Sequence, residues 1–162
     1  IPGLDWYGKG VRPVKRKYEA LDAYKYHVVV ENHIGAHHWT EKLADAFLSE
    51  CLPFYAGDPT IFEIFPKESI IPIPIDDPDE VVRIVRAAIA DGKYEKRREA
   101  VLEAKRLVLT KYNFWAQVIE LIKARQEEPT SVPGGFVYDR HVLRRRNPLV
   151  ALEDAWLHLT RG

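Results

Sequence analysis

The sequence has no methionine, a single cysteine, no excess of either charge and no long hydrophobic run. Because Cys51 has no second cysteine to pair with, an internal disulfide is excluded and nothing requires an oxidising compartment. The apolar runs at 28–30 and 70–75 are far shorter than the roughly 18 residues that a membrane-spanning helix needs. No charged leader precedes an apolar stretch at the start, which favours a cytoplasmic protein.

The balance of positive and negative charges argues against a nucleic-acid partner. Lys and Arg together number 24, as do Asp and Glu, so the formal net charge is zero. General nucleic-acid binding needs a basic surface, so we expect no nucleic-acid partner. The 46% hydrophobic content predicts a folded domain with a buried core instead of a disordered chain. Since the chain starts without methionine, we expect it to be part of a longer protein.

Strand-like runs alternate with segments of helical spacing. Strands are expected at 24–31, 52–55 and 69–75, and the prolines of the last favour an edge position. The β-branched run at 28–30 predicts a central strand that is buried on both faces. This alternation predicts an α/β domain with a mainly parallel sheet and flanking helices. Helices are expected at 41–50, 78–90, 94–109, 114–126 and 148–159, with a helix-compatible segment at 15–23, a single turn at 61–65 and a connector at 127–147.

Two strand ends are candidates for a site, 31–42 and 55–60, because ligands of parallel sheets bind beyond the carboxyl ends of the strands. Thr40 is a good N-cap for the helix that follows the first strand. Lys42, in the first turn of that helix, is unfavourable for the helix dipole unless an anion is bound beside it. The sequence therefore predicts a phosphate-type anion at this helix start.

Several segments resemble one family when they are taken in order: YKYHVVVEN at 24–32, TEKL at 40–43 and LPFYAG at 52–57. They are similar to the signature of the α1,3/4-fucosyltransferases, glycosyltransferase family 10, in which a Tyr-Lys-Phe…Glu-Asn strand precedes a Thr-Glu-Lys helix start and a Val-Pro-x-x-x-Gly turn. YGKG at 7–10 and the FP…SII stretch at 65–71 also resemble family segments, so the likeness runs from about 4 to 112.

The resemblance implies a GT-B enzyme that transfers a sugar, expected to be L-fucose, from a GDP-sugar to a saccharide acceptor with inversion. This chain would supply the C-terminal, Rossmann-like donor-binding half at 1–126, followed by a connector and a C-terminal helix at 127–162. The family's catalytic base lies in the other domain, so no catalytic residue is expected in this chain. No cofactor is required, because lysine, arginine and helix dipoles can carry the diphosphate charge.

By the same resemblance, Glu41 would bind the donor ribose, Lys42 the diphosphate, and Asn32 another part of the donor. An ionised carboxylate accepts two hydroxyl hydrogen bonds, and a lysine stabilises the charge that grows on a departing diphosphate. His38 stands where the family usually has tyrosine, two residues before Thr40, which puts donor preference and acceptor geometry in question. The remaining, secondary candidates are Glu31, which is expected to be mainly structural, Tyr26 and Gly57.

Other interpretations stay open at this point. His37 and Glu41 are four residues apart, but the loop–helix junction breaks that spacing, so no metal site is expected. The arginine cluster at 140–146 is expected to be a solvated face, although peripheral contact with the inner face of a bacterial membrane and homo-oligomerisation are not excluded. The alternatives to a fucosyltransferase are a non-catalytic nucleotide-binding or interaction domain and a GT-B enzyme that uses another nucleotide sugar.

Overall fold

The computed structural model describes residues 3–8, 10–126, 138–149, 151–152 and 156. The chain divides into two compact units, Ile1–Lys123 and Ala124–Gly162. Lys9, in the expected turn at 7–10, lies outside the described residues, as does the part of the expected connector at 127–137.

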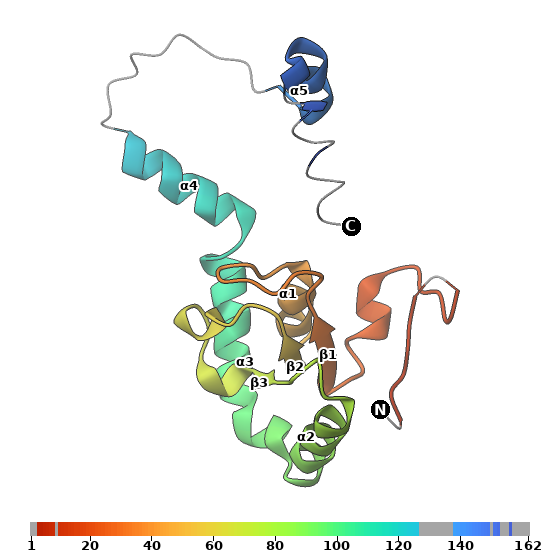
Figure 1. Ribbon diagram of the computed structural model, residues 1–162. Helices are drawn as coiled ribbons and strands as arrows, with labels where there is room; N and C mark the ends of the chain where they lie inside the picture. The colour runs from red at the N-terminus through yellow and green to blue at the C-terminus, as the bar shows by residue number, and fades with distance from the viewer. Residues whose placement is uncertain (1–2, 9, 127–137, 150, 153–155, 157–162) are drawn as a thin grey trace. The chain divides into compact units, whose positions relative to one another are not determined.

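The first unit contains a parallel three-stranded sheet in the order β1-β2-β3 (Figure 1). Its strands are β1 (Tyr26–Val30), β2 (Leu52–Ala56) and the two-residue β3 (Ile71–Pro72). β1 and β2 pair from Tyr26 opposite Leu52 to Val30 opposite Ala56, so their carboxyl ends lie side by side. The α/β class with a parallel sheet and flanking helices is confirmed, and β3 lies at an edge as its prolines predict.

The position of β1 differs from the expectation. β1 is an edge strand of the described sheet, and only Val29 among its five residues is buried. The central strand is β2, which pairs on both sides and is buried at all five positions. A β-branched run reports strand propensity, whereas a strand's place in the sheet depends on which partners pair with it.

The helices predicted between 41 and 126 agree with the structure to within two residues, whereas the 3₁₀ turn at 67–69 was not predicted. Asp77 caps one of them by accepting a hydrogen bond from the Glu80 N–H, with Pro78 in the first turn. The segment at 15–23 forms only a short 3₁₀ turn. The observed elements are η1 (Lys17–Ala20), α1 (Glu41–Leu48), η2 (Ile61–Glu63), η3 (Lys67–Ser69), α2 (Pro78–Ala90), α3 (Lys93–Thr110) and α4 (Phe114–Arg125).

The core of the first unit lies between the sheet and the helices α1 and α3, which contact each other and β2. The apolar face of α1 is the one that its spacing predicts, with Leu43, Ala46 and Phe47 fully buried. Cys51, directly before β2, is also fully buried, and burial raises the pKa of its thiol to about 11. This core fixes α1 against the sheet and so sets where the helix begins.

The second unit corrects the expected connector. Residues Arg140–Arg146 form helix α5, because the Asp139 carboxylate caps it by accepting from the N–H groups of His141 and Val142. Arginines in its last turn complement the helix dipole. In the expected helix 148–159, Leu149, Leu152 and Trp156 are helical, and residues 150, 153–155 and 157–159 lie outside the described part. No described helix combines the length and the apolar character that crossing a membrane demands.

Candidate functional site at the carboxyl ends of the strands

The site lies where β1 and β2 end. Glu31 follows β1, and its N–H donates to the Ala56 carbonyl at 2.9 Å, which continues the ladder by one residue. A pocket of about 320 Å³ opens beside this edge. Most of its lining is apolar, with two carboxylates, and includes Ile34, Gly57, Asp58, Ile73, Ile75 and Asp76.

Glu31 joins the end of β1 to the start of α1. Its side chain is completely buried. One carboxylate oxygen accepts from the Thr40 N–H at 2.9 Å, and the other accepts from the Thr40 hydroxyl at 2.6 Å. Hydrogen bonds to an ionised carboxylate are among the strongest in proteins, so this contact fixes the helix start relative to the sheet.

Lys42 lies at the same point. The Thr40 side chain accepts from the Lys42 N–H at 3.3 Å, as an N-cap should. The Lys42 ammonium lies 3.4 Å from a Glu31 oxygen and 3.9 Å from a Glu41 oxygen, and its side chain is 34% exposed. The helix start therefore presents a partly exposed cation together with the positive end of a helix dipole, an arrangement that suits an anion.

Glu41 points to solvent at the first position of α1, with its side chain 64% exposed. A hydrogen bond from its own backbone N–H lowers the pKa of its carboxyl below the ordinary value, helped by the charges of Lys42 and Lys17. An accessible, ionised carboxylate next to a lysine can accept hydrogen bonds from ligand hydroxyls.

Gly57 is required by close packing. A Cβ added there would lie 2.3 Å from the Tyr55 hydroxyl and 2.7 Å from Cγ of Glu31. Neither neighbour can withdraw easily, because Tyr55 and Glu31 are both buried. Gly57 thus contacts the Glu31 carboxylate region and also lines the pocket, so it connects the two parts of the site.

Asp58 is the residue that reasoning from motifs missed, although the segment 55–60 was a candidate. It is 2% exposed, and its Oδ1 accepts from the His37 N–H at 3.1 Å, the Thr60 N–H at 2.7 Å and the Thr60 hydroxyl at 2.6 Å. His37 has a left-handed backbone with φ of 58°, which these bonds hold in place. An aspartate directly before Pro59 in a strand-end turn is the signal that could have indicated it.

The structure brings five of the predicted site residues together: Glu31, Thr40, Glu41, Lys42 and, through Glu31, Gly57. Asn32 and His38 are exposed in the loop between β1 and α1. The ring of His38 meets that of His33 edge-on, with centroids 5.4 Å apart.

Tyr26 is not part of this cluster. It lies at the amino end of β1, where its ring stacks on Phe54 with centroids 5.4 Å apart. Its hydroxyl accepts from the Tyr94 N–H and donates to the Ala88 carbonyl. Tyr26 therefore lies apart from the residues gathered at the carboxyl edge, at the opposite end of β1.

The histidine-rich loop does not assemble a metal-ligating group. Within the described ranges, no cluster of three or more histidine, cysteine, aspartate or glutamate side chains could hold a metal ion.

Comparisons with known proteins bear on this site. No family model matches the chain. An α-(1,3)-fucosyltransferase of Helicobacter pylori is 38% identical over 58 residues, which is 36% of this chain and 12% of that protein. The chain therefore spans a small part of the curated relative that it matches.

Three solved structures also overlap part of the chain. Crystal structures of an α1,3-fucosyltransferase, one of them with GDP-fucose, overlap 56% of this chain at 28% identity and a TM-score of 0.46. A third, with GDP, overlaps at 26% identity and a TM-score of 0.45. TM-scores of this size do not by themselves establish a shared fold, so the sequence match carries the relationship. Over part of its length, the chain is similar to the α1,3-fucosyltransferases, the family that its motifs resemble.

Proposed function

We propose that this chain is the donor-binding part of a glycosyltransferase resembling the α1,3-fucosyltransferases. It binds a GDP-sugar, with L-fucose as the expected sugar, and the complete enzyme transfers that sugar to a saccharide acceptor with inversion. The observation that carries the proposal is the helix start of α1, where a partly exposed Lys42 and an exposed Glu41 lie at the carboxyl edge of a parallel sheet.

The chemistry of these groups matches the parts of a nucleotide diphosphate. The Lys42 ammonium and the amino end of α1 stabilise the two phosphates and the charge that develops on them as the sugar leaves. The Glu41 carboxylate, kept ionised by its lowered pKa, accepts the ribose hydroxyls. Asn32 and His38, exposed in the preceding loop, reach the donor from the side of β1.

The reaction itself needs a base that takes the proton of the acceptor hydroxyl as its oxygen attacks the anomeric carbon. The resemblance assigns that base to another domain of the complete enzyme. The bond to the diphosphate breaks on the opposite face of the sugar, so the configuration inverts. In this scheme the present chain holds the leaving group and orients the sugar, which lowers the barrier through charge stabilisation and positioning.

The proposal also covers the location of the protein, its acceptor and its self-association. We place the protein in the cytoplasm, at the inner face of a bacterial membrane, with a saccharide as the acceptor. Peripheral membrane contact and homo-oligomerisation belong to the same proposal. Centrifugation of cell lysates with membrane marker proteins tests the location, and light scattering tests self-association.

Calorimetric titration of this chain with GDP, with ADP and UDP as controls, tests the proposal. GDP should bind selectively. Lys42→Ala should weaken binding by about 1.5–3 kcal/mol, because a charge-assisted contact to the diphosphate is lost. Lys123→Ala is the matched control, since Lys123 is also paired with a glutamate, Glu120, on an exposed helix.

The outcomes separate the candidate functions. Selective binding of UDP or ADP would favour a GT-B enzyme with another donor. If the folded chain bound none of the three nucleotides, the nucleotide-binding proposal for this chain would be wrong. Equal weakening by the Lys42 and Lys123 variants would show that the nucleotide binds elsewhere.

A further inference from the structure

Glu31 is bonded more closely to Thr40 than to Lys42. The acidic residue nearest to Lys42, Glu31, has a fully buried side chain and accepts two short hydrogen bonds from Thr40. The ammonium of Lys42 lies farther away, 3.4 Å from the nearer Glu31 carboxylate oxygen. The Lys42 ammonium is also 3.4 Å from the Thr40 hydroxyl oxygen. Thr40 therefore makes the short hydrogen bonds to the carboxylate, whereas the two hydrogen bonds of the Lys42 ammonium, to Glu31 and to Thr40, are long, so the lysine is the more loosely held partner.

A loosely held lysine can exchange partners at low cost. Lysine is a compact point charge on a flexible four-carbon stem, and its ammonium has three donors. Glu31 stays hydrogen-bonded to Thr40 when the ammonium shifts toward an incoming anion. The Glu31 carboxylate also repels that anion, because it is buried and lies close to the place where Lys42 would meet a phosphate.

From this geometry we infer that Glu31 is the resting counter-ion of Lys42 and limits how tightly the site holds a diphosphate. With the site empty, Glu31 keeps the ammonium at the helix start. With a diphosphate bound, the anion and Glu31 share the same cation, so the nucleotide product leaves faster than it would from an unopposed lysine. The inference rests on the proposed function, and it assigns to Glu31 a regulating role in place of a purely structural one.

The test uses Glu31→Gln, which keeps an acceptor for the Thr40 N–H and removes the charge. We expect this variant to bind GDP about three- to tenfold more tightly, because one repulsive charge near the phosphates is gone. The gain should be smaller for GMP and absent for guanosine, which carries no phosphate. Stopped-flow displacement of a fluorescent GDP analogue should show slower dissociation.

Lys42→Met removes the shared cation. In that background Glu31→Gln should tighten GDP binding by a smaller factor than in the wild type, because no cation is left to share and only the direct repulsion between Glu31 and the phosphates is relieved. A purely structural Glu31 would instead weaken GDP binding, and by the same factor with or without Lys42. Glu50→Gln is the matched control: Glu50 is also ion-paired, with Lys105 at 2.9 Å and Arg98 at 3.1 Å, but it lies past the opposite end of α1.

The outcomes separate the two proposals. If the wild-type chain binds no GDP, the proposed function fails. The interaction between Glu31 and Lys42 is then measured from the thermal unfolding of the wild type, Glu31→Gln, Lys42→Met and the double variant. Additive changes in that cycle would overturn the counter-ion role, and a coupled change would support it. If GDP binds but Glu31→Gln weakens or does not alter it, the inference fails alone. Should Glu31→Gln not fold, Glu31→Asp withdraws the carboxylate by one methylene group and is expected to tighten binding as well.

Discussion

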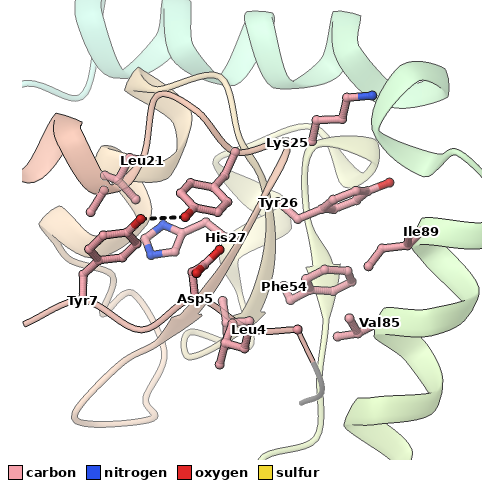
Figure 2. Close-up of a pocket in the computed structure, with 14 residues that line it drawn as sticks. Leu4, Asp5, Tyr7, Leu21, Lys25, Tyr26, His27, Phe54, Val85 and Ile89 are labelled. Carbon is pink, nitrogen blue, oxygen red and sulfur yellow. Dashed lines mark hydrogen bonds between the residues drawn. The ribbon is translucent and has the colours of Figure 1, made fainter. Parts of the chain in front are cut away.

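Each end of β1 has a partly or fully buried ionisable side chain, but within the described part of the chain only the one at the carboxyl end has hydrogen-bond partners. At the amino end, His27 lies beside Tyr7 in a pocket of about 230 Å³ that Tyr24 also lines (Figure 2). The Nδ1 atom of His27 is buried and has no partner among the described residues. Burial lowers the pKa of His27, opposed only by the charge of Asp45, so the imidazole is favoured in its neutral form. At the carboxyl end, both carboxylate oxygens of Glu31 accept hydrogen bonds, from Thr40 and Lys42.

The comparison shows that burial alone does not decide which ionisable groups can serve in binding. The pocket around His27 is lined mainly by aromatic and apolar side chains, with Asp5 and Lys25 as its other charged residues, and no described α-helix begins there with a lysine in its first turn. Glu31 is buried more deeply, yet Thr40 and Lys42 supply two hydrogen-bond donors and a cation. Of His27 and Glu31, only Glu31 lies next to the amino end of an α-helix, α1, and an anion site can therefore form there.

The largest effect should come from crowding the Glu31 end. Gly57→Ala places a methyl group against the Tyr55 hydroxyl and Cγ of Glu31, at separations that packed atoms do not tolerate. We expect the free energy of unfolding, measured in urea, to fall by about 3 kcal/mol. Lys67→Ala, at an exposed position, is the control. A change below about 1 kcal/mol would show that the neighbours relax and that the close packing is not essential.

Asp58 offers an intermediate case, with one oxygen accepting three hydrogen bonds and the other buried without a partner among the described residues. Asp58→Ala should lower the free energy of unfolding by about 2 kcal/mol, because the Thr60 N–H and the His37 N–H lose their shared acceptor. Hydrogen exchange should speed up in the loop at 33–38. Unchanged exchange there would contradict the role of Asp58 in holding His37.

Thr40→Val removes the cap and the hydroxyl that Glu31 accepts from, while it keeps the shape of the side chain. The expected loss in the free energy of unfolding is about 1–2 kcal/mol. The backbone N–H of residue 40 remains a donor to Glu31, so the loss should stay below that of Asp58→Ala. Thr110→Val, whose hydroxyl bonds only to a carbonyl within an exposed helix, should cost less and is the control.

The smallest effect belongs to the His27 end, and it should depend on pH. Because the pKa of His27 is lowered in the folded state, the unfolded chain binds the proton first, and stability falls as the pH drops below about 6.5. His27→Phe should remove this part of the acid sensitivity, worth less than about 1 kcal/mol between pH 7.5 and pH 5.5. Parallel urea curves at the two pH values provide the measurement, and an undiminished acid loss in the variant would contradict the assignment.

The helix starts could be read from the sequence because their signals are local. Thr40 caps the helix that its position predicts, Asp77 stands directly before the predicted helix at 78–90 and caps it, and the apolar spacing of α1 marks the face that is buried. The strand runs were equally clear, although β3 is only two residues long. Helix α5 was not predicted, because the segment at 127–147 was interpreted as a connector and its arginines as a solvated face, although Asp139 is a typical N-cap.

The grouping of site residues was predicted only in part. The segment from Thr40 to Lys42 is contiguous, so its members had to lie together whatever the fold. Tyr26 was a candidate as part of the motif at 24–32, but an extended strand separates residues by more than 3 Å for each step, which places it at the opposite end from Glu31. Asp58 was missed because its partners, His37 and Thr60, belong to a different loop and to the following turn.

The sequence by itself determined the element types, the caps of α1 and α2, the kinship with the α1,3-fucosyltransferases over part of the chain, and the lysine at a helix start. These features depend on residues that are neighbours along the chain. Only the tertiary structure decided that β2 is central, that Gly57 must lack a side chain, and that Glu31 is the buried partner of Lys42. Each of these depends on the parallel pairing of β1 with β2, which brings the ends of two distant segments side by side.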